Sequence, residues 1–563
     1  MKKIFLLSIL LLNLNACSKG QNVFRYPEYI GITIPDETRM EFVKLNMALA
    51  NIMNAYVDTL NTKKTVEDAI VGMLEKLDPH SNYLTPEEVR EMNEPLQGNF
   101  DGIGVQFNML TDTLNVVQVI PGGPSEKVGI TVGDKIMFIN DTLVAGVKLK
   151  NTDIMAKLRG KKGTTVNVKI QRNKNPELLT FSIVRDKIPI YSIDAAYMID
   201  KETGYIKINR FAATTYDEFI KAINKLKTNG MNNLILDLQG NGGGYLGTAI
   251  QIANEFLKRG SLIVYTEGVH QPREDQNASA NGQFEKGRLV LIVDESSASA
   301  SEIVSGAIQD WDRGVIVGRR TFGKGLVQRP LMLPDGSMIR LTVARYYTPT
   351  GRSIQKHYEN GNTDAYNHDL INRYNYGELL SADSIHFPDS LKYNTLLNKR
   401  TVYGGGGIMP DRFVPIDTTF NTRLMRELSG YGIVYKFVQH YLDDHRKVFQ
   451  SNFSDFDTYN AKFSVTDELM SDLIDYYRHD RANAVKDASD TDTTKQEGLT
   501  DEQIRTDLER SEGVIRAQIK SLFARNLFGE SEYYQIINNR INAYTEAIRI
   551  INNEKDYKKL LSE

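Results

Sequence analysis

The 563-residue sequence contains one cysteine, Cys17, so no disulfide can form within a single chain. Histidine is also scarce, and of the eight present only His270 falls within the region that is rich in predicted strands. A catalytic triad that depends on histidine therefore has little to be built from. The formal net charge of −3 gives no overall sign of nucleic-acid binding. No run of residues is long and apolar enough to span a bilayer.

The start of the chain has the features of an export signal. Two lysines precede a short apolar run, and Cys17 stands where a signal peptidase would cut. This pattern resembles a bacterial lipoprotein signal, in which residues 1–16 are removed, Cys17 becomes the lipidated N-terminus and residues 17–37 form a tether. The alternative is an ordinary secretory signal with cleavage nearby. Because no acidic run follows Cys17, we expect the periplasmic side of the envelope.

Residues 38–97 are predicted to be helical, because apolar residues recur there at helical spacing in two stretches. The second helix is expected to begin at Thr65, with Asp68 completing a capping box. It is expected to end before the turn Asp78-Pro79-His80-Ser81, since proline cannot continue a helix. We interpret His80 as a structural turn residue, because no second ligand lies beside it at metal spacing.

Residues 98–186 contain two glycine motifs in a fixed order. Phe100-Asp101-Gly102-Ile103-Gly104-Val105 precedes a predicted strand, and Gly133-Asp134-Lys135-Ile136-Met137-Phe138-Ile139-Asn140 follows a Pro-Gly turn. Together they resemble a PDZ domain. The two glycines of the first motif would let the backbone N–H groups of Gly102, Ile103, Gly104 and Val105 form a nest for the C-terminal carboxylate of a peptide. The peptide would then add as a strand to the edge that begins there.

Residues 187–356 and 404–420 are predicted to form an α/β unit, because apolar runs that suit strands alternate with amphipathic stretches. An insertion at 357–403 is rich in Tyr, Asn and Asp, and we can assign it no chemistry. Residues 421–563 are predicted to be helical and to pack against the core, with a dimer or adaptor contact as the alternative. The predicted strands are 204–208, 234–238, 289–293, 315–317 and 340–346, and the predicted helices are 216–228 and 247–258.

The first candidate catalytic segment is Ser297-Ala298-Ser299-Ala300-Ser301, which joins a predicted buried strand to a predicted helix. Backbone N–H groups are free at such a turn and can stabilise an oxyanion. The residues alone do not choose among the three serines. The glycine-rich loop 239–244 follows another predicted strand and lacks the spacing of a phosphate-binding loop. We interpret it as an oxyanion-hole loop.

The second candidate segment, Thr321-Phe322-Gly323-Lys324-Gly325-Leu326-Val327-Gln328, holds a lysine between two glycines. A lysine can act as a general base only where burial lowers its pKa. Glu302 and Asp310 are interpreted as local structural partners. Arg159 is interpreted as a solvated turn charge, and the alternative is a contact between the PDZ domain and the peptidase.

In this order the motifs resemble the carboxyl-terminal processing peptidases, also called tail-specific proteases, over roughly residues 40–415. The resemblance implies a crotonase-like α/β core with an inserted PDZ domain, and helical regions before and after them. The motifs that carry it are the 78–81 turn, the 100–105 loop, Ser297 to Ile303, Thr321 to Gln328, and Gly351-Arg352-Ser353-Ile354-Gln355.

The same resemblance implies roles for individual residues. Ser299 would be the nucleophile, Lys324 the general base and Gln328 the residue that orients the lysine. The N–H groups expected in the oxyanion hole are those of Ala300 and of Gly243 or Gly244.

We therefore expect a serine endopeptidase, anchored to the membrane by a lipid on Cys17, that binds the apolar C-terminal tails of protein substrates through its PDZ domain. The resemblance implies no metal, nucleotide or other cofactor. One alternative is a non-catalytic PDZ scaffold tethered to the membrane, which would tolerate Lys324→Ala. Another is a PDZ peptidase with a histidine base, which would need His270 beside Ser299.

Overall fold

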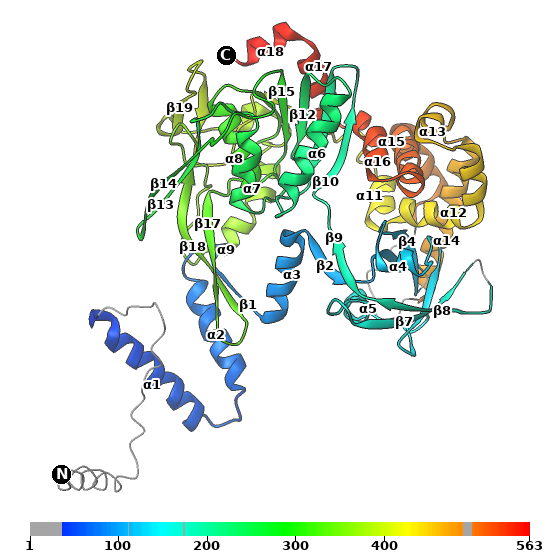
Figure 1. Cartoon of the computed structure of the whole chain (residues 1–563), viewed down its shortest axis with the longest axis horizontal. Coiled ribbons are helices and arrows are strands. Elements are labelled where there is room, and N and C mark those ends of the chain that lie inside the picture. Colours follow the sequence, from blue (N-terminus) through cyan, green and yellow to red (C-terminus); the bar gives the residue numbers. More distant parts are fainter. Residues whose placement is uncertain (1–35, 111, 173–174, 488–497, 563) are drawn as a thin grey trace, which may run out of the picture. The chain divides into compact units, whose positions relative to one another are not determined.

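The computed structural model describes residues 36–110, 112–172, 175–487 and 498–562 (Figure 1). The predicted signal peptide, Cys17 and nearly all of the predicted tether lie outside the described residues. The chain divides into two compact units, 1–70 and 71–563, and each is considered by itself.

The smaller unit contains α1 (Arg39–Ala55) and the start of α2 (Thr62–Leu74). Because α2 begins at Thr62, the predicted start at Thr65 is wrong. The Thr65 hydroxyl donates to the Asn61 carbonyl at 3.0 Å, so it bonds to the backbone four residues earlier and caps nothing.

A six-stranded sheet forms the core of the larger unit, in the order β10-β11-β12-β15-β16-β21. The pairings from β11 to β21 are parallel, and β10 is antiparallel to β11. Every residue of β12 and β15 is buried, because helices cover both faces, and this explains their unbroken apolar sequences. The strands are β10 (Ile193–Met198), β11 (Thr203–Ile208), β12 (Asn233–Asp237), β15 (Leu289–Val293), β16 (Val315–Gly318) and β21 (Arg412–Phe413).

Alternate residues of these strands belong to two hydrophobic clusters, each of which includes its own layer of helices. Leu234 and Leu236 pack with the first layer, whereas Ile235 packs with the second. The second layer comes from the end of the chain, so the last two helices pack against the core, as expected. The first layer is α6 (Thr215–Thr228), α7 (Leu246–Asn254) and α8 (Ala300–Asp310), and the second is α17 (Asn542–Asn552) and α18 (Glu554–Leu560).

A second, antiparallel sheet lies beside α8 and contains the predicted strand 340–346. It follows the order β1-β18-β13-β14, with β17 paired to β18. The lysine segment leads directly into β17, whereas the serine segment follows β15 of the core sheet. The strands are β1 (Asn82–Leu84), β13 (Leu262–Gly268), β14 (Gln271–Asn277), β17 (Leu326–Met332) and β18 (Met338–Tyr347).

The PDZ region is a sheet in the order β3-β4-β5-β7-β8, with a short β6 (Thr142–Leu143) paired to β5. The chain enters and leaves this region through an antiparallel pair, β2 (Asn99–Gly102) and β9 (Asp186–Pro189). Because β3 is an edge strand, its outer side can accept another strand. The elements are β3 (Val105–Leu110), β4 (Thr113–Val119), α4 (Pro124–Lys127), β5 (Lys135–Ile139), α5 (Asn151–Leu158), β7 (Thr165–Gln171) and β8 (Leu179–Val184).

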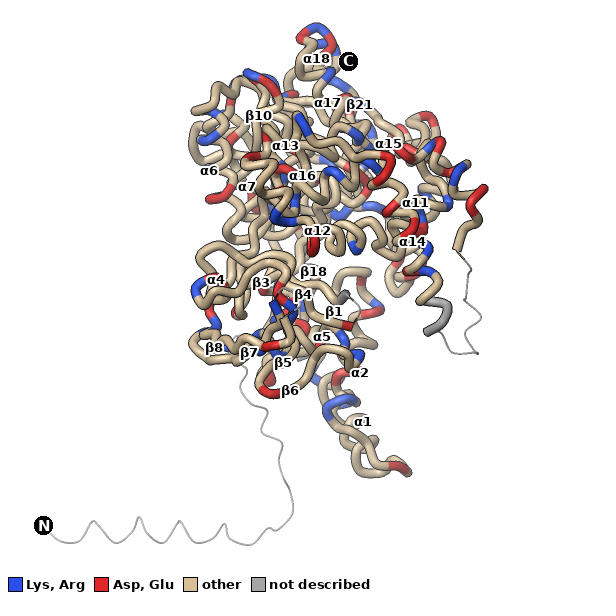
Figure 2. The backbone as a smooth tube through the Cα atoms, turned by 90° about the vertical axis from the view of Figure 1, so that its right-hand side faces the viewer, with Lys and Arg blue, Asp and Glu red and all other residues tan. Residues whose placement is uncertain are grey.

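Helices α11 to α16 form a hydrophobic core of their own, so the expected packing against the core sheet does not apply to all of residues 421–563. None of the helices in the described ranges combines the length and apolar character that a bilayer crossing requires. In the view of Figure 2, basic and acidic residues are interspersed along α11, α12, α14 and α15. The helices are α11 (Arg423–Gly430), α12 (Ile433–Asn452), α13 (Phe456–Lys462), α14 (Asp467–Asp487), α15 (Asp501–Leu527) and α16 (Glu530–Ile537).

Two further segments contact the PDZ region and the lysine segment, respectively. Helix α3 (Pro86–Gln97) precedes the PDZ region and begins with a capping box formed by Thr85 and Glu88. The insertion contains α9 (Thr363–Asn367), α10 (Asp369–Asn375), β19 (Lys392–Asn394) and β20 (Thr401–Tyr403).

Candidate active site

Ser299 occupies a strained turn between β15 and α8. Its φ of 55° and ψ of −110° lie outside the regions that a residue with a side chain ordinarily adopts. Such strain persists only where the surrounding bonds impose it. The turn places Ser299 directly before the first residue of α8, where the helix has free N–H groups.

The three serines of the segment differ in their hydrogen bonds. The Ser297 hydroxyl donates to the Leu238 carbonyl at 2.8 Å, and the Ser301 hydroxyl donates to the Asn241 carbonyl at 2.9 Å. Both of these serines are fully buried. Ser299 is half-buried, and its side chain forms a capping box with Glu302 at the start of α8. Among the described residues, the Ser299 hydroxyl donates its proton to no acceptor. Of the three, Ser299 is the one whose hydroxyl is available for chemistry.

Lys324 is half-buried two residues before β17, in a loop that requires its flanking glycines. Gly323 has a φ of 87°, and a Cβ at Gly325 would lie 2.9 Å from the Gln355 backbone nitrogen. Burial, together with the nearby charge of Arg340, lowers the pKa of the Lys324 amine from 10.5 to about 8. A useful fraction of this amine is therefore uncharged near neutral pH.

The Glu302 carboxylate connects the serine turn to the lysine loop. It is fully buried, and its Oε2 accepts the Ser299 N–H at 2.8 Å and the Lys324 N–H at 2.9 Å. Its Oε1 accepts the Gly323 N–H at 2.7 Å and the Thr321 hydroxyl at 2.5 Å. Burial raises the pKa of Glu302 to about 7, while these bonds oppose the rise. Glu302 is thus the structural partner that the sequence analysis expected.

Tyr346 provides a second connection between the two segments. Its hydroxyl lies 3.1 Å from the Ser299 carbonyl oxygen and also contacts the Lys324 carbonyl oxygen. Backbone groups of Ser299 and Lys324 therefore bond to the same two side chains, those of Glu302 and Tyr346. These shared bonds bring the two segments together. Within the described part of the chain, no hydrogen bond joins the Ser299 hydroxyl directly to the Lys324 amine.

Asp310 is also a structural partner, as expected. Its carboxylate accepts from the Thr350 N–H at 2.9 Å and pairs with Arg352 at 2.7 Å, where both charged side chains are fully buried. This pair ties the end of α8 to the segment after β18.

The glycine-rich loop lies against the serine turn. A Cβ at Gly243 would be 2.9 Å from the Ser299 Cβ and 3.0 Å from the Ala300 nitrogen, so only glycine fits there. The Gly243 N–H donates to Asn241 Oδ1 at 2.9 Å. The N–H groups of Ala300 and Gly244 have no acceptor among the described residues. These two donors are therefore available in this structure, and the Gly243 donor is engaged.

Gln328 points toward the turn at residues 78–81. Its Nε2 donates to the Thr342 hydroxyl at 3.3 Å, and that hydroxyl donates to Asp78 Oδ1 at 2.9 Å. Asp78 also accepts the His80 N–H at 2.9 Å. The role of Gln328 in orienting Lys324 stays a prediction.

His80 belongs to that structural turn but also borders the lysine. Burial, with the nearby charge of Lys324, lowers the pKa of His80 to about 4, so the ring is neutral at pH 7. Its Nε2 lies 2.8 Å from the Tyr366 hydroxyl. The sequence offered no signal for this position beside the site, because Tyr366 belongs to the insertion.

The insertion supports the lysine loop through hydrogen bonds to its backbone. The buried Arg373 side chain donates to the Arg320 carbonyl at 2.6 Å and to the Thr321 carbonyl at 3.1 Å. Directly before the insertion, the Lys356 amine lies 4.1 Å from the ring centre of Phe322 and donates to the carbonyl of Tyr366 in the insertion at 3.2 Å. Sequence reasoning missed these residues because their partners are remote in the chain.

A groove of about 380 Å³ runs between the start of β3 and helix α5 in the PDZ region. The N–H groups of Ile103 and Gly104 have no acceptor in the ranges that the structure describes. Val105, Met155 and Leu158 line the groove and make it largely apolar. An edge strand, free N–H groups and an apolar groove are what an added peptide strand requires.

The interpretation of Arg159 as a solvated charge is wrong. Its guanidinium pairs with Glu94 of α3 at 2.5 Å and lies 4.8 Å from the ring centre of Phe100. Arg159 therefore connects the PDZ region to α3, which lies outside that region. The alternative is a contact between the PDZ domain and the peptidase, whereas the observed contact is with the N-terminal helical region.

His270 is exposed in the turn between β13 and β14. No contact between His270 and Ser299 is present in the described chain, so the geometry gives no support to a histidine base. No group of three or more His, Cys, Asp or Glu residues that could hold a metal ion occurs within the described ranges.

Comparison with known proteins assigns most of the chain. Residues 202–363 match peptidase family S41, residues 102–183 match a PDZ domain, and residues 32–88 match the N-terminal domain of the activating protease CtpB. Residues 424–529 match a family of unknown function.

Named relatives agree with this assignment. The chain is 37% identical over 305 residues to a carboxyl-terminal-processing protease of Picosynechococcus sp., covering 53% of this chain and 72% of that protein. It is 35% identical over 317 residues to the carboxy-terminal processing protease CtpA of Bacillus subtilis, covering 56% of this chain and 67% of that protein. A solved photosystem II D1 C-terminal processing protease is 28% identical with a TM-score of 0.32, covering 57% of this chain and 91% of that one. The chain therefore belongs to the carboxy-terminal processing proteases of peptidase family S41, which are serine-type peptidases, and it contains a PDZ domain.

Proposed function

We propose that this protein is an endopeptidase that binds the C-terminal tail of a protein substrate through its PDZ domain and cleaves the substrate with a Ser299–Lys324 dyad. The observation that carries the proposal is the shared Glu302 carboxylate, which holds the backbone of both residues at one place. Membership of a peptidase family favours this function over a non-catalytic scaffold.

The reaction would begin when the uncharged Lys324 amine takes the proton of the Ser299 hydroxyl. The serine oxygen attacks the substrate carbonyl carbon, and the resulting oxyanion accepts hydrogen bonds from the N–H groups of Ala300 and Gly244, because the Gly243 N–H is engaged by Asn241. The carbon–nitrogen bond then breaks as the lysine ammonium returns the proton to the leaving amine. Gln328 would orient the amine during these proton transfers.

The second half of the reaction would use water. Lys324 takes a proton from a water molecule as the water oxygen attacks the acyl-enzyme carbonyl. The ester bond to Ser299 breaks, the substrate leaves as a carboxylic acid, and the proton on the lysine returns to the serine oxygen. The cycle requires no group beyond the chain, the substrate and water.

Tail capture would use the edge of β3. The N–H groups of Ile103, Gly104 and Val105 would bind the terminal carboxylate, with the φ of 78° at Gly104 allowing the loop to turn directly after Gly102. The apolar groove beside α5 favours a tail that ends in an apolar side chain. A dimer or adaptor contact through the C-terminal helices stays a prediction.

Replacing either member of the dyad should abolish cleavage. Ser299→Ala and Lys324→Ala are each expected to lower kcat at least about 10³-fold on a protein with an apolar C-terminal tail, because nucleophile and base act as a unit. Ser296→Ala is the matched control, since Ser296 is exposed on the same turn. Full activity of Ser299→Ala would contradict the proposal.

The pH dependence should report the lysine. A pKa of about 8 for Lys324 means that kcat/KM rises with pH up to about 8 and falls roughly tenfold per pH unit below it, because the protonated amine cannot accept a proton. The charge of Asp78 raises the pKa of Lys324, so Asp78→Asn should move the rising limb to lower pH. The exposed Asp275→Asn serves as control. A profile independent of pH between 6 and 8 would exclude this base.

The insertion should affect chemistry more than binding. Arg373→Ala removes both bonds to the carbonyls before the lysine, so we expect kcat to fall about 10- to 100-fold while KM changes by less than about twofold. Asn372→Ala changes an exposed neighbour on the same helix and should have no effect. Thermal unfolding of each variant separates loss of positioning from loss of fold. An unchanged kcat in Arg373→Ala would show that the insertion does not position the lysine.

We further propose that the protein is lipid-anchored through Cys17 on the periplasmic side of a bacterial envelope. In cells fed a labelled fatty acid, the wild type should carry the label and sediment with membranes. Cys17→Ser should lose the label and leave the membrane fraction, because no other cysteine is present. A labelled Cys17→Ser variant would exclude this anchor.

A further inference from the structure

The edge strand β3 presents different chemistry on its two faces. Val105 and Phe107 pack toward the core of the PDZ domain and line the apolar groove beside α5. Side chains alternate along a strand, so Gln106 and Asn108 project from the opposite face. Gln106 lies directly across from Gln118 of β4 in the sheet register.

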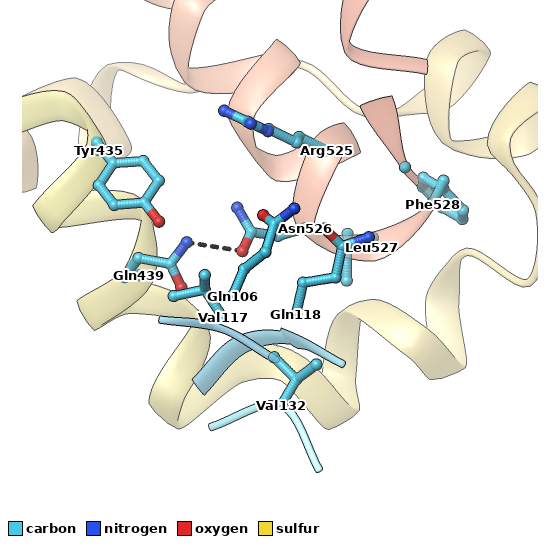
Figure 3. Close-up of a pocket in the computed structure, with 11 residues that line it drawn as sticks. Gln106, Val117, Gln118, Val132, Tyr435, Gln439, Arg525, Asn526, Leu527 and Phe528 are labelled. Atoms are coloured by element: carbon cyan, nitrogen blue, oxygen red, sulfur yellow. Dashed lines mark hydrogen bonds between the residues drawn. The ribbon is translucent and has the colours of Figure 1, made fainter. Parts of the chain in front are cut away.

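That opposite face is covered by the C-terminal helices. The Asn108 side chain donates to the Tyr435 hydroxyl of α12 at 3.3 Å. Next to this bond, a cavity of about 230 Å³ lies between the β3–β4 face and helices α12 and α15. Figure 3 shows Gln106 and Gln118 projecting from the strands toward the side chains of the two helices.

Gln106 is shared by the two cavities, since it lines both the peptide groove and this second cavity. A peptide added to β3 alternates in the same way as β3 itself. If its last side chain enters the groove with Val105, its penultimate side chain faces the other way, level with Gln106. The second cavity lies on that side.

We propose that this cavity receives the penultimate side chain of the substrate tail, so that helices α12 and α15 take part in tail recognition. The inference rests on the proposed capture of the tail by the PDZ domain and adds to it the source of specificity at one position.

The lining indicates which side chain fits. It presents the amides of Gln106, Gln118, Gln439 and Asn526, the phenol of Tyr435 and the guanidinium of Arg525. Gln439 already donates to Asn526 at 2.6 Å, and Arg525 pairs with Glu530 at 2.7 Å while remaining 42% exposed. Arg525 is the one charged residue of the lining, so the cavity favours a long side chain that accepts hydrogen bonds. Glutamate and glutamine fit best, and an apolar side chain would leave these groups unpaired.

The test uses the full chain carrying Ser299→Ala, which would bind tails without cleaving them. Fluorescent peptides end in the same leucine and differ only in the penultimate residue, which is Glu, Gln, Ala or Leu, and binding is followed by anisotropy. We expect the Glu and Gln peptides to bind about 5- to 10-fold more tightly than the Leu peptide. Adding Arg525→Ala should reduce the preference for Glu to within about twofold, and adding Tyr435→Phe should weaken it. In both of these variants the affinity for the Leu peptide should stay unchanged.

Arg516→Ala is the matched control, because Arg516 lies on the same helix but pairs with Glu512 and Asp467 outside the cavity. Equal affinities for all four peptides, or a preference that survives Arg525→Ala and Tyr435→Phe, would overturn the inference and leave tail capture standing. An equal loss of affinity for every peptide in Arg525→Ala would also overturn it, since it would indicate general support of the PDZ domain. Failure of all four peptides to bind would remove the tail-capture proposal and this inference together.

Discussion

The candidate site depends on one buried carboxylate. Glu302 is placed by the first turn of α8, and it accepts four hydrogen bonds from two segments that come from different sheets. Only the ionised form offers enough acceptor sites in this geometry, because a protonated carboxyl must donate from one oxygen. If Glu302 lost these donors, a buried charge would be left without hydrogen bonds, which is strongly destabilising. The serine turn and the lysine loop therefore hold each other in place through Glu302. The strain at Ser299 is maintained by the same contacts.

Continuous apolar sequence was enough to predict the core strands, because β12 and β15 are buried on both faces and carry no polar alternation. The same reasoning could not choose among Ser297, Ser299 and Ser301, since their difference lies in bonds to Leu238 and Asn241 more than fifty positions away in the chain. It placed a helix start at Thr65 because a threonine before an acidic residue resembles a cap. In the structure that hydroxyl bonds backward to Asn61.

The residues that support the lysine loop were beyond sequence reasoning for a similar reason. Arg373 and Tyr366 lie in a segment whose composition suggests only a polar insertion, and their partners are backbone carbonyls and a histidine ring remote in the chain. Backbone carbonyls leave no pattern in the sequence, since every residue has one. Arg159 was misread on the same basis, because glycine and lysine neighbours suggest an exposed turn, whereas its partner Glu94 belongs to another element.

The PDZ domain is contacted on two sides by elements outside it, and this limits how a bound tail could act. Arg159 ties the end of α5 to α3, and Asn108 ties the outer face of β3 to α12. A strand added to β3 would lie between these two contacts, in reach of α5 on one face and of the C-terminal helices on the other. Binding energy gained at both faces can orient the PDZ domain as well as retain the peptide, because a ligand shifts an arrangement only through contacts that differ between its states. A tail that made contacts on only one face would be retained but would not orient the PDZ domain against the C-terminal helices.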